Sequence, residues 1–472
     1  MLRSWVSGEF KLLTRNPALP IILVLLLAAT AFGAYTGAGH VAERRQNEQL
    51  VWKETEKEWQ KRKQEYADVY AGKIPQPSFG VLNYIESHAF LPAGPLAFLA
   101  TGHDDLSPRH AAVSLWKRND TLFERYEIDS PTLLREGVLD LGFLVVFVMP
   151  ILIIALCFDA LAADRDQGRL ALLRLGRVSL WRLLAARIAL RGGAVVVCFM
   201  GLSLIGFAIG ASLLGTTGES VARLILWLLA LSLYGSFWMA LCIAVNSYET
   251  RAEVNAFLLG LSWIGFVVLL PATLGAMADT LLPAPSKVEH MVAARELENR
   301  IREEGNDTLA RYFEAHPDLA GDAPPVFDDF FKAHYAVHQN IEARLAPMMA
   351  QYRAARGRRD TVCGWLAYAT PPAVFLRTLE EIAGSSRTRV NAYLAQATSF
   401  ADTWHEHLAP SAVGGPRLHP DRLDHLPRFS FAEPPLRQLA PPFLSSALYL
   451  VTLTALLAWK AHRRLREDTS VA

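Results

Sequence analysis

Six stretches of this chain are long and apolar enough to cross a lipid bilayer, and they limit the fold more than any other feature. A helix needs about 20 mostly apolar residues to cross the hydrocarbon core. Inside that core the backbone must satisfy its own hydrogen bonds, which favours helices. The stretches lie at roughly residues 17–37, 138–158, 192–214, 224–245, 256–276 and 443–459. The sequence therefore predicts an all-α, polytopic membrane protein with six transmembrane helices.

The first stretch follows a lead that contains Arg3, Lys11 and Arg15, and a charged lead also opens a signal peptide. This lead is long, the apolar run has full transmembrane length, and no clear A-x-A cleavage site follows it. We therefore expect residues 1–37 to form an N-terminal surface helix and an uncleaved first transmembrane helix.

Basic residues gather in three segments next to the predicted helices, and this distribution predicts the orientation. Cytoplasmic loops of membrane proteins carry an excess of Lys and Arg. The basic segments are the N-terminal lead, the loop after the second stretch, and the C-terminal tail with Lys460, Arg463, Arg464 and Arg466. With six transmembrane helices all three segments fall on one side, so we expect both termini in the cytoplasm.

Two long segments, 38–137 and 277–442, then lie on the opposite face as extracytoplasmic insertions. The first opens with a charged run of good helix formers in which Glu/Lys pairs recur at helical spacing. The second has helical patterns and ends in a proline-rich connector, 408–442. We expect both insertions to be mainly helical. Residues 138–276 then form four transmembrane helices, and 443–472 form the sixth with a basic tail.

The composition and motifs argue against two kinds of ligand. The formal net charge is only +1, so nucleic-acid binding has no electrostatic support. The nearest fragment to a phosphate-binding P-loop is Gly72-Lys73, and Ala67 stands where the first glycine of that motif belongs. We therefore expect that this chain does not bind ATP itself.

Cysteine and histidine positions predict no metal site. The four cysteines lack C-x-x-C spacing, and three of them lie inside apolar stretches. His334 and His338 are four residues apart on an expected helix, with Glu342 one turn further, a spacing that can hold a divalent metal. Exposed histidines at this spacing are common, and we expect no metal there.

The loop after the second stretch is the segment most suggestive of a function. It begins with Asp159, Asp164 and Asp166, continues through Gly168 into a leucine-rich turn, and ends in a basic helix. Leucines on one side and charges on the other are typical of a helix that lies along the membrane surface. We expect such a helix over 162–176, where a soluble partner can grip it. The alternative is an ordinary basic cytoplasmic loop.

This loop resembles the coupling-helix segment of type-2 ABC exporter permeases, in which E-x-E-x-G-T-L-E-L-L-L precedes a basic stretch. The matching run is Asp164-Arg165-Asp166-Gln167-Gly168-Arg169-Leu170-Ala171-Leu172-Leu173. Asp replaces Glu, Arg169 replaces Thr and Ala171 replaces Glu, while the acid–glycine–leucine framework remains. The resemblance implies that a separate ATPase subunit, which holds ATP and Mg²⁺, contacts this segment. The implied contact residues are Asp164, Arg165, Asp166, Gln167, Gly168, Arg169, Leu172 and Leu173.

The resemblance extends over most of the chain. LPAGPLAFLATGHDDLSPRHAAVSLW and YEIDSPTLLREGVLDLGFLVVFVMPILIIAL look like the region around the second transmembrane helix in a bacterial subgroup of these permeases. ATPPAVFLRTLEEIAGSSRTRVNAYLAQATSFADTW looks like the C-terminal outer domain of the subgroup, whose function is unassigned. These likenesses imply an exporter subunit of the bacterial inner membrane, in contact with membrane lipids. A second copy or a paralogue would be its permease partner, and no cofactor is implied for this chain.

Three smaller features lie within the apolar stretches. Gly206 and Gly210 form a G-x-x-x-G face that permits close helix packing, within the chain or between two copies. Pro150 and Pro271 predict helix kinks, which we expect to be static bends. Asp140 lies near the end of its stretch, and we expect it in the headgroup region.

Three functions remain open from the sequence. The first, which we expect, is a transport permease whose ATPase activity resides in a partner chain. The second is an ATP-driven assembly protein that works mechanically on an outer partner. The third is a membrane-anchored enzyme, for which the sequence offers no nucleophile–base pair and no ligand cluster with suitable spacing.

Overall fold

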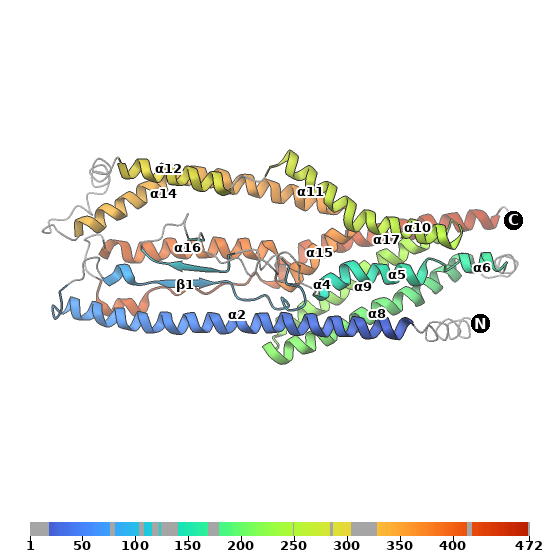
Figure 1. Cartoon of the computed structure of the whole chain (residues 1–472), viewed down its shortest axis with the longest axis horizontal. Helices are drawn as coiled ribbons and strands as arrows, with labels where there is room; N and C mark the ends of the chain where they lie inside the picture. Colours follow the sequence, from blue (N-terminus) through green and yellow to red (C-terminus); the bar gives the residue numbers. More distant parts are fainter. Residues whose placement is uncertain are drawn as a thin grey trace.

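The computed structural model describes residues 18–75, 81–102, 108–115, 122–123, 140–168, 179–248, 250–283, 287–303, 328–412 and 418–470. This part of the chain is mostly helical, and its long helices run along an elongated molecule (Figure 1). Its single sheet, within these ranges, is an antiparallel hairpin of β1 (Ser87–Phe90) and β2 (His110–Val113). In that hairpin Ser87 lies opposite Val113.

Six helical segments are long and apolar enough to cross a membrane. They are α2 (Ala18–Tyr70), α4 to α6 (Leu141–Phe143, Met149–Cys157 and Ala162–Asp166), α8 (Leu180–Leu214), α9 (Gly218–Asn246), α10 with α11 (Ala252–Ile264 and Leu270–Leu281), and α17 (Ala440–Ser470). These segments correspond to the six apolar stretches of the sequence. The prediction of six helices of transmembrane length is therefore confirmed.

The turn between α8 and α9 shows how local sequence sets these helices. Gly215 ends α8 with a φ of 82°, a conformation that glycine adopts without a steric penalty. Thr217 then begins α9, because its hydroxyl accepts a 3.1 Å hydrogen bond from the Ser220 amide. The Ser220 hydroxyl bonds back to the Thr217 amide, which completes a capping box.

Helix α9 is the centre of the bundle. It packs against α5, α8, α10 and α17, and also against α15 (Pro371–Ala383), while α2 packs along α8. The shared core contains large buried side chains from several of these helices, including Phe199, Trp227, Trp238 and Phe375.

The beginning of α2, helix α6 and the end of α17 lie at the same end of the molecule (Figure 1). This arrangement agrees with the expectation that the three basic segments share one side. Which face of a membrane this end occupies stays a prediction. We call it the loop end, after the loop that contains α6.

The opposite end holds a second core, which we call the distal unit. It is built from the C-terminal half of α2, residues 81–91, the β-hairpin, α16 (Arg387–Ala412) and residues 418–431. Trp59 of α2 lies against Trp404 of α16, with ring centroids 6.0 Å apart. Tyr393 of α16 donates a 2.9 Å hydrogen bond to the Ala89 carbonyl, and burial raises the pKa of its phenol.

The remaining helices form an arm beside the distal unit. α12 (Lys287–Glu303) and α14 (Asp328–Leu366) pack together through a small cluster around Ile341 and Leu345. The proline-rich connector, where it is described from 418 to 439, has two 3-10 turns, Pro420–His425 and Leu436–Gln438. Within the described ranges, α2 continues as a helix to Tyr70 in the first long segment, and α12, α14, α15 and α16 make up most of the second. The hairpin in the first segment was not predicted.

Candidate functional site

The loop end of the second transmembrane segment is held by arginines from α8. Arg187 donates to the Asp164 carboxylate at 2.7 Å and also bonds the Ala160 carbonyl. Arg191, one turn further along α8, donates to Asp159 at 2.9 Å and to the Leu156 carbonyl at 3.2 Å. The α8 helix therefore binds both the loop and the end of α5.

Two asparagines complete this arrangement from α9 and α10. Asn246 donates to the Cys157 carbonyl at 3.1 Å and accepts from the Leu161 amide at 3.3 Å. Asn255 donates to the Phe158 carbonyl at 3.2 Å and to the Asn246 side chain at 3.3 Å. Both asparagines are buried.

These contacts provide hydrogen-bond partners for backbone carbonyls at the end of a helix. The last four carbonyls of a helix have no partner within the helix, and burying an unpaired carbonyl costs free energy. Here the carbonyls of Leu156, Cys157, Phe158 and Ala160 are bonded by side chains of α8, α9 and α10. A displacement of α6 must therefore move three neighbouring segments with it or break buried polar contacts. We call this set of residues the braced loop.

The structure separates the predicted contact residues into two groups. Asp164 is buried and paired with Arg187, so it braces the loop from inside, and its expected contact with a partner stays a prediction. Arg165, Gln167 and Gly168 are exposed at the tip of the loop. The side chain of Asp166, and the whole of Arg169, Leu172 and Leu173, lie outside the described residues.

The surface helix expected over 162–176 is interrupted. Helix α6 ends at Asp166, and Gly168 adopts a φ of 70°, which breaks the regular helical path. The first described part of the loop therefore ends in a turn at Gln167 and Gly168.

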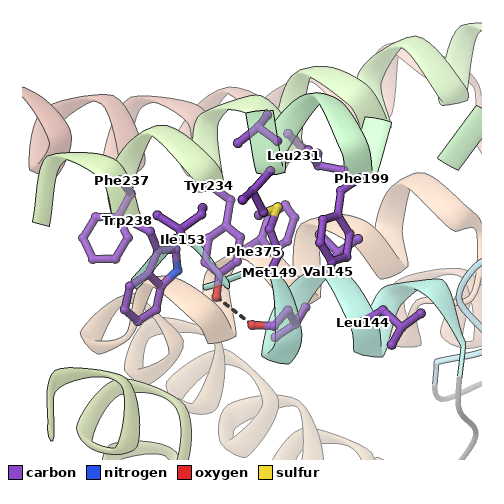
Figure 2. Close-up of a cluster of buried hydrophobic side chains, with 14 of the residues drawn as sticks. Leu144, Val145, Met149, Ile153, Phe199, Leu231, Tyr234, Phe237, Trp238 and Phe375 are labelled. Atoms are coloured by element: carbon purple, nitrogen blue, oxygen red, sulfur yellow. Dashed lines mark hydrogen bonds between the residues drawn. The ribbon is translucent and has the colours of Figure 1, made fainter. Parts of the chain in front are cut away.

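Each of the two kinked segments contains a π-helical turn directly before its proline. The turns are Leu144–Val148 before Pro150 and Gly265–Leu269 before Pro271. Pro150 has no N–H, so the Val146 carbonyl lacks its usual partner four residues on. The Tyr234 hydroxyl of α9 donates to this carbonyl at 3.0 Å (Figure 2). Trp263 of α10 donates to the Phe147 carbonyl at 3.3 Å.

Helix α15 enters the bundle at the same place, although its sequence lies within the segment predicted to be outside. The Phe375 ring stacks on the Tyr234 ring, with centroids 4.0 Å apart and planes at 11° (Figure 2). Arg223 of α9 donates to the carbonyls of Glu381 at 3.1 Å and Ile382 at 2.9 Å, at the end of α15. α9 therefore contacts α15 at two places, through Tyr234 at Phe375 and through Arg223 at the C-terminal end of α15.

The two glycines of the G-x-x-x-G face lie against residues 96–100 and α2. A Cβ on Gly206 would lie 3.1 Å from Leu99 and 3.7 Å from Ala34, and one on Gly210 would lie 2.2 Å from the Phe98 ring.

Asp140 is the N-cap of α4. Its carboxylate accepts hydrogen bonds from the backbone amides of Phe143 and Thr101, at 2.7 and 3.0 Å.

His334 and His338 both lie in α14. Within the described ranges, no three His, Cys, Asp or Glu side chains lie close enough together to hold a metal ion. The expectation that no metal binds at these histidines stays a prediction.

Comparison with known proteins assigns one part of the chain. Residues 287–432 match a family described as a domain of unknown function, DUF3526. The match begins with α12 and includes α14, the inserted helix α15 and α16. No curated protein and no solved structure matches the chain.

Proposed function

We propose that this chain is the membrane-spanning permease subunit of an ATP-driven ABC transporter, working as an exporter in a bacterial inner membrane. Two copies, or one copy and a paralogue, form the transmembrane core, and separate ATPase subunits that carry ATP and Mg²⁺ bind at the loop end. The chain itself has no enzymatic activity and binds no cofactor. Its termini and the braced loop then face the cytoplasm.

The braced loop is the observation that carries this proposal. Its tip is exposed at Arg165 and Gln167, whereas its base is fixed to α8, α9 and α10 by buried hydrogen bonds. A subunit that pushes on such a tip transmits the displacement to three transmembrane segments at once. An ordinary basic cytoplasmic loop, whose charges only set the orientation of the protein in the membrane, needs no such buried hydrogen bonds.

The movement has a path through the bundle. The second transmembrane segment runs from the braced loop to the π-helical turn before Pro150, where regular helical bonding is already interrupted. Tyr234 connects this turn to Phe375 of α15. ATP binding favours one of two arrangements of these helices, and the exchange between the two gives alternating access.

A second candidate function is mechanical work on a partner at the distal unit. The observation that favours it is α2, which continues without a break for 53 residues from the membrane segment into the distal unit. Together with α15, this helix makes the distal unit part of the same body as the bundle. Motion driven by ATP would then reach a partner without transport.

The decisive experiment is co-purification with candidate ABC ATPase subunits, followed by ATP hydrolysis assays with candidate substrates. Arg165→Glu and Leu172→Asp should weaken ATPase binding, because both change the loop that the partner contacts. Lys57→Glu makes the same charge change as Arg165→Glu at an exposed site in α2, and should have no effect. Full ATPase binding by both loop variants would remove the braced loop from the mechanism. Coupled hydrolysis without any transported compound would favour the mechanical function.

A further inference from the structure

A cavity of about 510 Å³ lies where α14, α15 and the first turns of α17 meet. Its walls include Arg377 and Glu381 of α15, Trp365 and Gly364 of α14, and Ser445 of α17. A volume of this size is typical of small-molecule sites. The cavity is separate from the braced loop.

Two opposite charges on one wall are left without ionic partners. Arg377 and Glu381 are four residues apart on α15, so their side chains leave the same face of the helix about 5–6 Å apart. They form no ion pair with each other, and neither has an ion-pair partner elsewhere in the described ranges. The other acid of the wall, Asp360, is already paired with Arg387 at 2.9 Å.

The positions of the two groups are set by their surroundings. Gly364 makes room for the guanidinium, because a Cβ there would lie 2.6 Å from Nη1 of Arg377. Glu381 accepts hydrogen bonds from the hydroxyls of Ser386 at 2.9 Å and Thr388 at 2.6 Å, which orient the carboxylate and leave its charge uncompensated. The wall therefore presents a positive group, for which Gly364 leaves room, beside a negative group that two hydroxyls orient.

Aromatic side chains place this cavity at a membrane surface. Trp365 is 73% exposed at the rim. Tyr368 bonds Ser445 at 2.8 Å and packs edge-on against Tyr449, with centroids 5.4 Å apart, in the first turns of the last transmembrane helix. Trp and Tyr are enriched where a bilayer meets water. The exposed Leu448 continues this surface towards the hydrocarbon region.

We propose that this cavity binds the headgroup of an aminophospholipid from the leaflet opposite the loop end. Arg377 binds the phosphate, and Glu381 accepts hydrogen bonds from the ammonium, which two methylene groups join to the phosphate. The acyl chains lie along α17, beside Leu448. A purely anionic headgroup satisfies Arg377 but leaves Glu381 unpaired, and a choline headgroup has no N–H to donate. This inference does not depend on whether the chain is a permease.

The test is lipid titration of the purified full-length protein, followed by native mass spectrometry. Phosphatidylethanolamine, phosphatidylglycerol and phosphatidylcholine of identical acyl chains are compared. We expect phosphatidylethanolamine to bind about tenfold more tightly than the other two, as for one added charge-assisted hydrogen bond. Equal binding of all three lipids, or preference for phosphatidylglycerol, would overturn the proposal. A water-soluble glycerophosphoethanolamine competitor should displace the lipid, and failure to do so would place the lipid elsewhere.

Variants separate the two charges. Arg377→Ala should weaken binding of both phosphatidylethanolamine and phosphatidylglycerol, whereas Glu381→Gln should weaken only the former and so abolish the preference. Arg356→Ala removes an exposed arginine of α14 outside the cavity wall and is the control. This control should keep the wild-type preference. An unchanged preference in Glu381→Gln, or its loss in Arg356→Ala, would refute the assignment.

Discussion

The ion pair between Arg187 and Asp164 gives the most direct test of the braced loop. Their side chains are only 9% and 6% exposed, and the Nη1–Oδ2 distance is 2.7 Å. Removing one partner of a buried pair costs about 3–5 kcal/mol, because the remaining charge stays buried and loses that partner. Arg187→Met should therefore strongly lower the stability of the protein. The neighbouring pair, Arg191 with Asp159, is the matched comparison.

This comparison pair differs mainly in burial. Asp159 is 36% exposed, so water can solvate its carboxylate when the arginine is removed. A pair of this kind contributes about 0–1 kcal/mol, and Arg191→Met should have a correspondingly small effect. The exposed Arg182 of α8 provides a control, since Arg182→Met changes the same residue type at the same end of the helix.

The assay is the midpoint of thermal unfolding in detergent, with all variants measured at equal protein concentration. Replacing both partners by apolar residues of similar size removes the desolvation cost together with the attraction. Asp164→Leu/Arg187→Met should therefore unfold at a higher temperature than Arg187→Met alone. The reasoning fails if Arg187→Met and Arg191→Met lower the midpoint equally, or if the double variant is the least stable of the set.

Three further predictions follow from contacts elsewhere in the bundle. Gly210→Val should destabilise the protein by about 1–3 kcal/mol because its Cβ meets the Phe98 ring, and Phe98→Ala in the same chain should recover part of the loss in thermal unfolding. Tyr234→Phe should cost about 1–3 kcal/mol by leaving the Val146 carbonyl unpaired; an unchanged unfolding midpoint would show that this bond is dispensable. Single cysteines at Ala71 and Gln167, both exposed, should react with membrane-impermeant maleimides from opposite faces of the membrane, and labelling from the same face would contradict six crossings.

The transmembrane helices were predictable because their signal is local. Each needs only its own run of apolar residues, and no knowledge of its neighbours. The prolines likewise marked the two distorted segments correctly, since a missing N–H disturbs any helix. The π-helical form of the distortion was not predictable, because it depends on Tyr234 and Trp263, which are distant in sequence.

The braced loop was only partly predictable for the same reason. The arginines of α8 appeared in the sequence as loop charges, and their i, i+4 spacing at Arg187 and Arg191 was the only hint that both face one neighbour. Asn246 and Asn255 are polar residues beside apolar stretches, a signal that we did not use. The burial of Asp164 could not be predicted from its motif, because a motif gives residue types, whereas burial depends on how the helices pack.

The composition of the distal unit has a consequence for how the protein is made. Its core packs Tyr66 and Leu91 against Tyr393 and Trp404. The N-terminal part of this core is therefore synthesised long before the C-terminal part. Roughly 300 residues separate Phe123 from the last part of this core, which at about 5–20 residues per second amounts to about 15–60 s of synthesis. During that interval the first half has an apolar face that α16 does not yet cover. Biogenesis of this protein therefore requires a chaperone or the membrane surface itself to protect that face until α16 arrives.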